Sequence, residues 1–237
     1  MKKFEFTGET KTLFNGTILH RIKALVEIKL GCFIVKAGDL GGWIEKEENL
    51  SQDGNAWVGG NAEVYGNAWV GGNAEVHGNA MVYGNARVYG NAEVGGNAMV
   101  GGDAMVYGNA EVYGNARVYG NAEVYGNAEV YGNARVGGNA RVGGNAEVHG
   151  NAEVGGDSYV RKPEHILVMG PMGSRNAYTT FTGNKAGEIK VKCGCFFGDI
   201  PEFLDKVEKT HGDSKYGNVY RLAVQVALEQ IDTEPID

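Results

Sequence analysis

Six polar side chains near the C-terminal end of this 237-residue chain are typical of an anion-binding site. They are Ser174, Arg175, Asn176, Thr179, Thr180 and His211. A polar turn after a strand can bind an anion through its backbone amides, and a guanidinium group forms paired hydrogen bonds with a phosphate or a carboxylate. We therefore predict a small anionic ligand at these residues. The alternative is a turn whose polar groups only satisfy one another.

Three cysteines, Cys32, Cys193 and Cys195, make an odd count. The single residue between Cys193 and Cys195 leaves too little chain for an ordinary disulfide between them. The pair also lacks the second pair of ligands that a zinc site needs. We expect reduced thiols, no bound metal and no cofactor.

A six-residue period runs through the middle of the chain. Valine recurs at every sixth position from Val58 to Val160, in a unit that reads Asn-Ala-x-Val, then Tyr, Gly or His, then Gly. Ala and Val lie two residues apart, so they share one face of a strand, and the Gly-Asn pair that follows favours a corner with positive φ. Each unit therefore predicts one short strand and one corner, with Ala and Val inside.

Such short strands bury enough apolar surface only if the chain coils. Three units per turn place residues 18 apart directly above one another, about 4.8 Å apart, in parallel strands. The units between Val58 and Val160 then predict six triangular coils around a column of valine and alanine. In this arrangement Val58 stacks on Val76.

The order aliphatic, variable, Gly, Asn, small, variable, seen in Val-Tyr-Gly-Asn-Ala-Trp at 64–69, resembles the hexapeptide repeat of left-handed parallel β-helix proteins, which are best known among acyltransferases. The resemblance covers about 105 residues. It implies a left-handed coil and, as in many of those proteins, a trimer. Residues 35–58 are also similar to the N-terminal region of prophage-borne and bacterial hexapeptide-repeat proteins that are described as acyltransferases.

A solenoid exposes unpaired strand edges at both ends, so the non-repetitive parts of the chain are expected to cover them. Residues 1–53 predict an N-terminal β cap in which Trp43 plugs the open coil. The repeat region takes up 54–160. The fold class is thus an all-β solenoid, a left-handed parallel β-helix of about six coils, with a module at each end.

Residues 161–237 predict a small C-terminal α+β domain. Two apolar segments flank a turn at 183–187 and read as a hairpin. Two helices follow, the first with Asp199 as its cap and the second beginning near Ser214.

Sorting the outward positions of the repeat by threes places five glutamates on one face, in line with Trp57. They are Glu75, Glu93, Glu111, Glu129 and Glu147. Like charges about 5 Å apart in water repel by under about 1 kcal/mol, so such a row is tolerable. The row either binds cations or a basic partner, or it is a solvated face that keeps the solenoid soluble.

Methionines and tyrosines at outward positions predict a contact surface. They are Tyr65, Met81, Tyr83, Tyr89, Met99, Met105, Tyr107 and Tyr125. Contiguous exposed apolar area usually marks an interface, so we predict a homo-oligomer, with a trimer favoured by the resemblance, or a host protein as partner. Alternatively, the stacked rings only support one another.

The charge of the chain excludes some partners. The net charge is -7, the isoelectric point is near 5.3, and no lysine occurs between Lys46 and Lys162. This composition offers no basic surface for a nucleic acid. No apolar run is long enough for a signal peptide or a membrane span. We therefore expect a cytoplasmic protein, in the host cytoplasm if phage-encoded, with neither nucleic acid nor membrane as partner.

Acyl transfer would need a histidine as general base beside a loop that shapes a cleft. His77 and His149 fall on one edge four coils apart, near 19 Å, and no insertion interrupts the repeat. We therefore assign no catalytic residue. The leading prediction is a non-catalytic phage or prophage-type scaffold, oligomeric, that binds or sequesters a small anionic ligand or a host protein. An acyltransferase and a structural component of a larger assembly are the alternatives.

Overall fold

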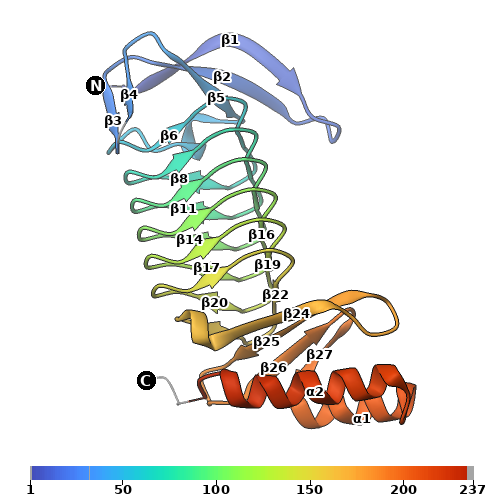
Figure 1. Ribbon diagram of the computed structural model, residues 1–237. Coiled ribbons are helices and arrows are strands. Elements are labelled where there is room, and N and C mark those ends of the chain that lie inside the picture. The colour runs from blue at the N-terminus through green and yellow to red at the C-terminus, as the bar shows by residue number, and fades with distance from the viewer. Residues whose placement is uncertain (1, 32, 234–237) are drawn as a thin grey trace.

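The computed structural model describes residues 2–31 and 33–233. It is a β-solenoid of about seven turns with parallel sheets, followed by a small domain of one antiparallel sheet and two helices (Figure 1). The prediction of a solenoid with two end modules is confirmed. The solenoid has about one turn more than the repeat predicts. Ile44 and Leu50 lie outside the repeat units, but they pair in parallel with Val64 and Val70 and so add a turn before the first repeat.

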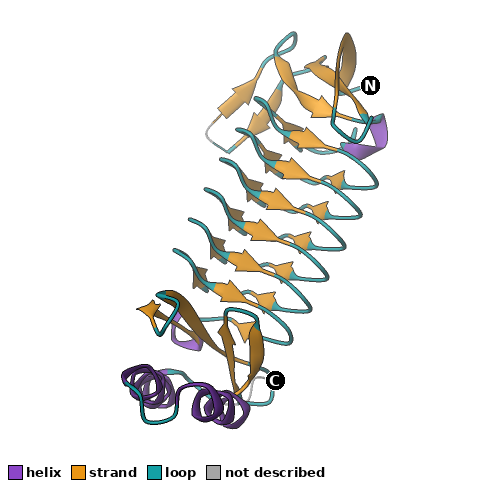
Figure 2. Ribbon diagram, turned by 90° about the vertical axis from the view of Figure 1, so that its right-hand side faces the viewer, coloured by secondary structure: helices purple, strands orange, loops and turns teal. Residues whose placement is uncertain are grey.

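The eighteen two-residue strands of the repeat form three faces, which also appear in Figure 2 as three stacks of short arrows. The methionine face consists of β7 (Glu63–Val64), β10 (Met81–Val82), β13 (Met99–Val100), β16 (Arg117–Val118), β19 (Arg135–Val136) and β22 (Glu153–Val154). The mixed face consists of β8 (Trp69–Val70), β11 (Arg87–Val88), β14 (Met105–Val106), β17 (Glu123–Val124), β20 (Arg141–Val142) and β23 (Tyr159–Val160). The glutamate face consists of β6 (Trp57–Val58), β9 (Glu75–Val76), β12 (Glu93–Val94), β15 (Glu111–Val112), β18 (Glu129–Val130) and β21 (Glu147–Val148).

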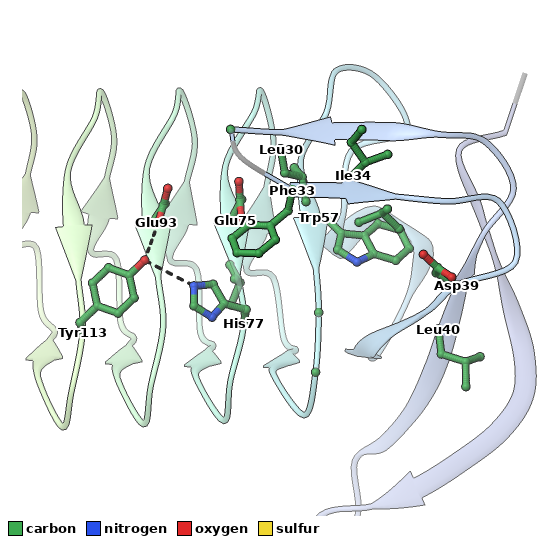
Figure 3. A pocket seen from close by; sticks show the side chains of 15 residues that line it. Leu30, Phe33, Ile34, Asp39, Leu40, Trp57, Glu75, His77, Glu93 and Tyr113 are labelled. Atoms are coloured by element: carbon green, nitrogen blue, oxygen red, sulfur yellow. Dashed lines mark hydrogen bonds between the residues drawn. The ribbon is translucent and has the colours of Figure 1, made fainter.

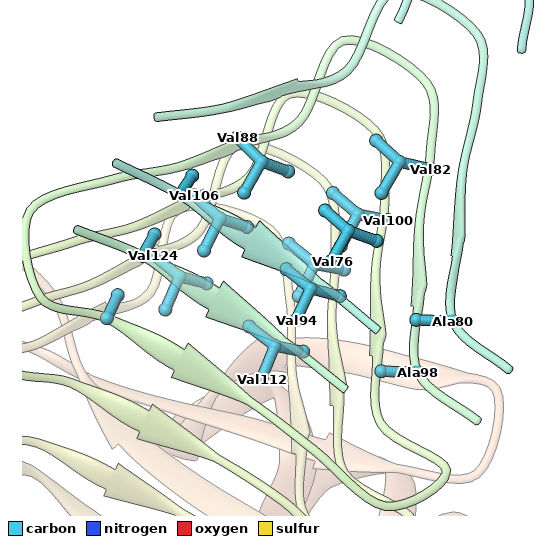
Figure 4. Close-up of a cluster of buried hydrophobic side chains, with 14 of the residues drawn as sticks. Val76, Ala80, Val82, Val88, Val94, Ala98, Val100, Val106, Val112 and Val124 are labelled. Carbon is cyan, nitrogen blue, oxygen red and sulfur yellow. The ribbon is translucent and has the colours of Figure 1, made fainter. Parts of the chain in front are cut away.

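Valines and alanines fill the inside of the coil, as the repeat predicts. Val58 pairs with Val76 in parallel register, so the stacking interval is 18 residues. The core valines, such as Val94 and Val112, are 0% exposed (Figure 4). Each buried valine stabilises the fold by about 1.5–2 kcal/mol before the loss of chain entropy.

Glycine and asparagine build the corners. The glycine directly before the Asn or Asp of each corner has a positive φ, for example 71° at Gly102. Beside it, asparagine side chains form ladders in which each amide donates to the next asparagine 18 residues on, as from Asn91 Nδ2 to Asn109 Oδ1 at 3.0 Å. One ladder contains Asp103, which accepts from Asn85 at 2.8 Å but has no amide to donate onward.

Two neighbouring glycines make a matched test of this corner. A Cβ on Gly102 would lie 3.0 Å from backbone atoms of Gly120, and the left-handed φ of this position is strained for any residue with a Cβ. Gly102→Ala should therefore lower the free energy of unfolding by at least about 1–2 kcal/mol. Gly101 has no positive φ, and a Cβ there would meet only the movable ring of Tyr83. Urea denaturation should therefore show a smaller loss for Gly101→Ala. Equal losses would contradict the corner geometry.

The N-terminal cap continues the methionine face. It consists of β1 (Phe4–Thr12), β2 (Ile18–Ala24), the hairpin of β3 (Ile28–Leu30) and β4 (Phe33–Val35), β5 (Leu40–Ile44) and the short helix η1 (Glu47–Asn49). Phe4, Ile22, Ile44 and Leu50 close the apolar column. The side chain of Asn49 also hydrogen-bonds the backbone of the first turns, because its Nδ2 donates to the carbonyl oxygen of Ala68 at 2.8 Å.

The expectation that Trp43 plugs the coil is wrong. Trp43 pairs with the outward residue Glu63, and the next residue, Ile44, takes the inward position because successive side chains of a strand alternate between its faces. The ring of Trp43 instead lies under two cations, with Lys11 Nζ at 4.5 Å and the guanidinium of Arg21 at 5.3 Å from its centroid.

The C-terminal domain places its sheet between the last turn of the solenoid and the two helices (Figures 1 and 2). After η2 (Pro163–His165), its elements are β24 (Ile166–Met172), β25 (Ala177–Gly183), β26 (Ile189–Cys193), β27 (Phe196–Asp199), α1 (Ile200–His211) and α2 (Lys215–Gln230). Asp199 caps α1 by accepting from Glu202 N, and Ser214 caps α2 by accepting from Gly217 N. The predicted hairpin and both helix starts are confirmed.

Strand β25 covers the free edge of the solenoid. The backbone N of Glu153 donates to Thr180 Oγ1 at 3.0 Å, and the hydroxyl groups of Ser158 and Thr182 lie 2.7 Å apart. On its other face, Phe181 packs in the core of the C-terminal domain with Phe203. In the described part of the chain, no helix is both long and apolar enough to cross a membrane.

Candidate functional site

A groove of about 210 Å³ in the C-terminal domain brings together three of the six residues that the sequence selects. Ser174 and Arg175 come from the turn between β24 and β25, and His211 comes from the end of α1. The aromatic ring of Tyr220 on α2 forms part of the groove, and the His211 ring stacks on it with centroids 5.7 Å apart. Strands β24 and β25 pair in antiparallel fashion, and the turn that joins them lies beside residues of α1 and α2.

The other three residues do not line this groove. Asn176 is exposed in the turn, where its φ of 51° closes the corner. Thr179 is buried and donates to Cys193 Sγ at 3.2 Å, and Thr180 faces the solenoid, where it accepts from Glu153 N. Side chains alternate along β25, so two consecutive threonines point to opposite faces of the strand.

The groove also contains a residue that the sequence reasoning missed. Lys206 on α1 lines it together with Arg175 and His211, and none of the described lining residues is Asp or Glu. The available signal was helical spacing, because Phe203, Lys206 and Thr210 recur at intervals of three and four on one side of α1. The groove is therefore a basic site on an apolar floor.

The hydroxyl of Tyr220 lies at the base of the groove, 3.9 Å from Cys193 Sγ. Burial, followed by the charge of Cys193 and its hydrogen bond, raises the pKa of Tyr220 to about 12, so the phenol stays protonated at neutral pH. Cys193 and Cys195 are free thiols, whereas Cys32 lies outside the described residues. Within residues 2–31 and 33–233, no group of three or more His, Cys, Asp or Glu side chains is placed to hold a metal ion.

A larger cleft, of about 740 Å³, lies at the other end of the molecule. The β3–β4 hairpin forms one wall, and the first turns of the glutamate face form the other (Figure 3). Trp57, Glu75 and Glu93 line it from the glutamate face, and His77 and Tyr113 line it from the adjacent corner positions. The repeat pattern could not reveal this site, because nothing in the pattern says where the hairpin lies.

Hydrogen bonds link three of these side chains. The hydroxyl of Tyr113 donates to Glu93 Oε2, and His77 Nε2 lies 3.4 Å from the same hydroxyl. Burial and the hydrogen bond to Glu93 raise the pKa of Tyr113. His149, by contrast, is exposed and stacks on Tyr131 with centroids 5.3 Å apart, so the two histidines of the solenoid lie in different surroundings.

The outward tyrosines stack in the ladders that the period of 18 predicts. The centroid distances are 5.6 Å for Tyr65–Tyr83, 5.1 Å for Tyr89–Tyr107 and 5.4 Å for Tyr107–Tyr125. These rings, like Met81, Met99 and Met105, are half-buried. Several rings cover a glycine of the next turn: a Cβ on Gly143 would lie 2.3 Å from Tyr125. Part of the aromatic surface is thus used within the solenoid itself.

The central repeats also match a known family model. Residues 80–96 and 110–126 match the family model described as the YdcK β-solenoid repeat. Together with the parallel stacking of the strands, this match identifies the chain as a β-solenoid repeat protein. Both matched stretches lie within the repeat region, so the match includes neither the N-terminal cap nor the C-terminal domain. The comparison with curated proteins found no match.

Proposed function

We propose that this protein is a non-catalytic binding scaffold of phage or prophage type, in which the rigid solenoid is a spacer and the C-terminal groove binds a small anionic ligand. The observation that carries the proposal is the convergence of Arg175, Lys206 and His211 on one groove without an acidic lining residue among those described. The resemblance to prophage-borne hexapeptide proteins supports the biological setting.

The chemistry of the groove favours an aromatic phosphate or carboxylate. A guanidinium and an ammonium group bind such an anion through charge-assisted hydrogen bonds. The rings of Phe203 and Tyr220, at right angles with centroids 5.6 Å apart, offer an apolar floor for a ring. The small volume suits a ligand with one ring and one anionic group.

Phenyl phosphate is a suitable probe. We expect it to bind in isothermal titration calorimetry and to lose at least about tenfold in affinity in Arg175→Gln, because one charge-assisted interaction is removed. Lys209→Gln is the matched control, since Lys209 lies on α1 outside the groove and pairs with Asp205. Unchanged binding in Arg175→Gln, or no binding to the unaltered protein, would contradict the proposal.

We also propose that copies associate side by side, as a trimer. Tyr83 and Met99 border a hollow of about 350 Å³ on the methionine face together with Arg117 and Arg135. On the glutamate face, Glu111 and Glu129 are exposed and stack in register, so this face is acidic. The arginines at this hollow and the carboxylates of the glutamate face carry opposite charges, which favours contacts between copies, and such contacts close into a ring if the rotation permits. The mass of the intact protein in light scattering tests this proposal.

Acyl transfer is a second candidate, favoured by one observation. His77 lies in a cleft of about 740 Å³, within 3.4 Å of the Tyr113 hydroxyl, and a cleft of this kind can hold an acyl donor. Incubation with acetyl-CoA separates the two functions. Acetyl-CoA turnover that disappears in His77→Ala would contradict the binding-scaffold proposal and support acyl transfer.

A further inference from the structure

The cleft beside the β3–β4 hairpin has the dimensions and lining of a small-molecule site. Its volume of about 740 Å³ is within the usual range for such sites. The hairpin contributes Phe33 and Ile34, whose side chains are 73% and 56% exposed. Large apolar side chains exposed around a hollow usually mark a binding surface. The indole of Trp57 lines the same cleft from the solenoid side (Figure 3).

Three acidic side chains line this cleft: Asp39 accepts a hydrogen bond from Lys36 N, whereas Glu75 and Glu93 border the apolar wall. Glu75 and Glu93 pair in register on neighbouring turns, and both are half-buried, whereas Glu111, Glu129 and Glu147 of the same face are exposed. The hairpin therefore covers only the part of the glutamate face that lines the cleft.

The negative charge of the cleft is not neutralised by the protein. Glu93 accepts a hydrogen bond from Tyr113, but Glu75 makes no hydrogen bond or ion pair with any residue that the structure describes. No Lys or Arg occurs among the described residues that line the cleft. Burial and the neighbouring Glu93 carboxylate raise the pKa of Glu75, as expected for a charge without a partner. A bound cation would remove this unfavourable arrangement.

We propose that the cleft binds a small organic cation with an aromatic body, of the arylalkylamine class. The ammonium group lies against Glu75 and Glu93, where partly desolvated carboxylates form charge-assisted hydrogen bonds. The aromatic body lies against the exposed ring of Phe33 and the small accessible part of Trp57, and the face of an aromatic ring also attracts a cation. This site and its ligand charge are independent of the anion groove at the opposite end of the molecule.

Tryptamine is the probe, measured by isothermal titration calorimetry on the full-length protein. We expect Glu75→Gln to weaken tryptamine binding at least about tenfold, since an ion pair is lost. Glu129→Gln is the matched control, because it removes the same charge from the same face outside the cleft, and we expect unchanged affinity. Both side chains point away from the core, so both variants should fold. Phe33→Ala should weaken binding as well.

Three results would overturn this inference. The first is equal weakening in Glu75→Gln and Glu129→Gln, which would mean that the whole glutamate face attracts cations without a site. The second is binding of indole-3-acetate as tightly as tryptamine, because the two share an aromatic body and differ in charge. The third is no heat of binding at millimolar tryptamine. None of these outcomes affects the anion groove.

Discussion

Val112→Asp should abolish the folded solenoid. Val112 is 0% exposed and stacks between Val94 and Val130 in the middle of the glutamate face. The substitution removes a buried apolar side chain and places a carboxylate among valines and alanines that offer it no partner. The two effects together lower the free energy of unfolding by several kcal/mol. We expect loss of the cooperative thermal transition in circular dichroism, or expression only as aggregate.

The neighbouring residue is the control for this result. Glu111 precedes Val112 and is exposed on the same strand, so Glu111→Asp changes the outer surface and leaves the column intact. It should unfold within a degree or two of the unaltered protein, because surface substitutions usually change stability by less than about 0.5 kcal/mol. A Val112→Asp protein with a normal melting temperature would mean that the column tolerates charge, contrary to the observed packing.

Removal of the C-terminal domain should convert the protein into polymers. A chain that ends at Arg161 loses β25, and with it the Thr180 hydroxyl that accepts from Glu153 N and the contact between Ser158 and Thr182. The last turn then exposes unpaired backbone groups and the end of the apolar column, which favours end-to-end association. Light scattering should report growing mass, and electron microscopy should show elongated particles.

A proline variant of the shortened chain separates this cause from simple misfolding. The backbone N–H of Glu153 loses its Thr180 acceptor in the shortened chain, so Glu153→Pro removes an unpaired donor from the exposed edge without changing the valine column, and it should suppress the growth while the β signal in circular dichroism persists. A shortened chain with the same mass as the intact protein would show that β25 is not needed as a cap. Polymers of the intact protein would instead support the structural component of a larger assembly.

Most of the solenoid could be predicted from the sequence. The period of six determines which side chains point inward, and three units per turn determine that Glu75 stacks on Glu93 and Tyr89 on Tyr107. Each such contact repeats at a constant separation of 18, so a single assumption accounts for the whole stack. The extra turn could not be predicted, because Ile44 and Leu50 occupy inward positions without the Asn, Ala and Gly that mark a repeat unit. Left-handedness and the exact domain boundaries stay predictions.

The candidate sites could be predicted only in part. Ser174, Arg175 and His211 meet in one groove because two helices fold back over the C-terminal sheet, but the sequence does not distinguish Thr180, which caps the solenoid, from a ligand-binding threonine. Alternation along β25 decides that difference, and it depends on which face the solenoid covers.

The sequence by itself determined the column, the corners and the outward rows of this protein, because in a repeat every long-range contact is a copy of one local pattern. Only the tertiary structure decided where Phe33 approaches Glu75 and where Lys206 joins Arg175. Those contacts occur once each, between segments with no shared period. Their positions follow from how the end modules pack on the solenoid, and that packing is a property of the whole folded chain.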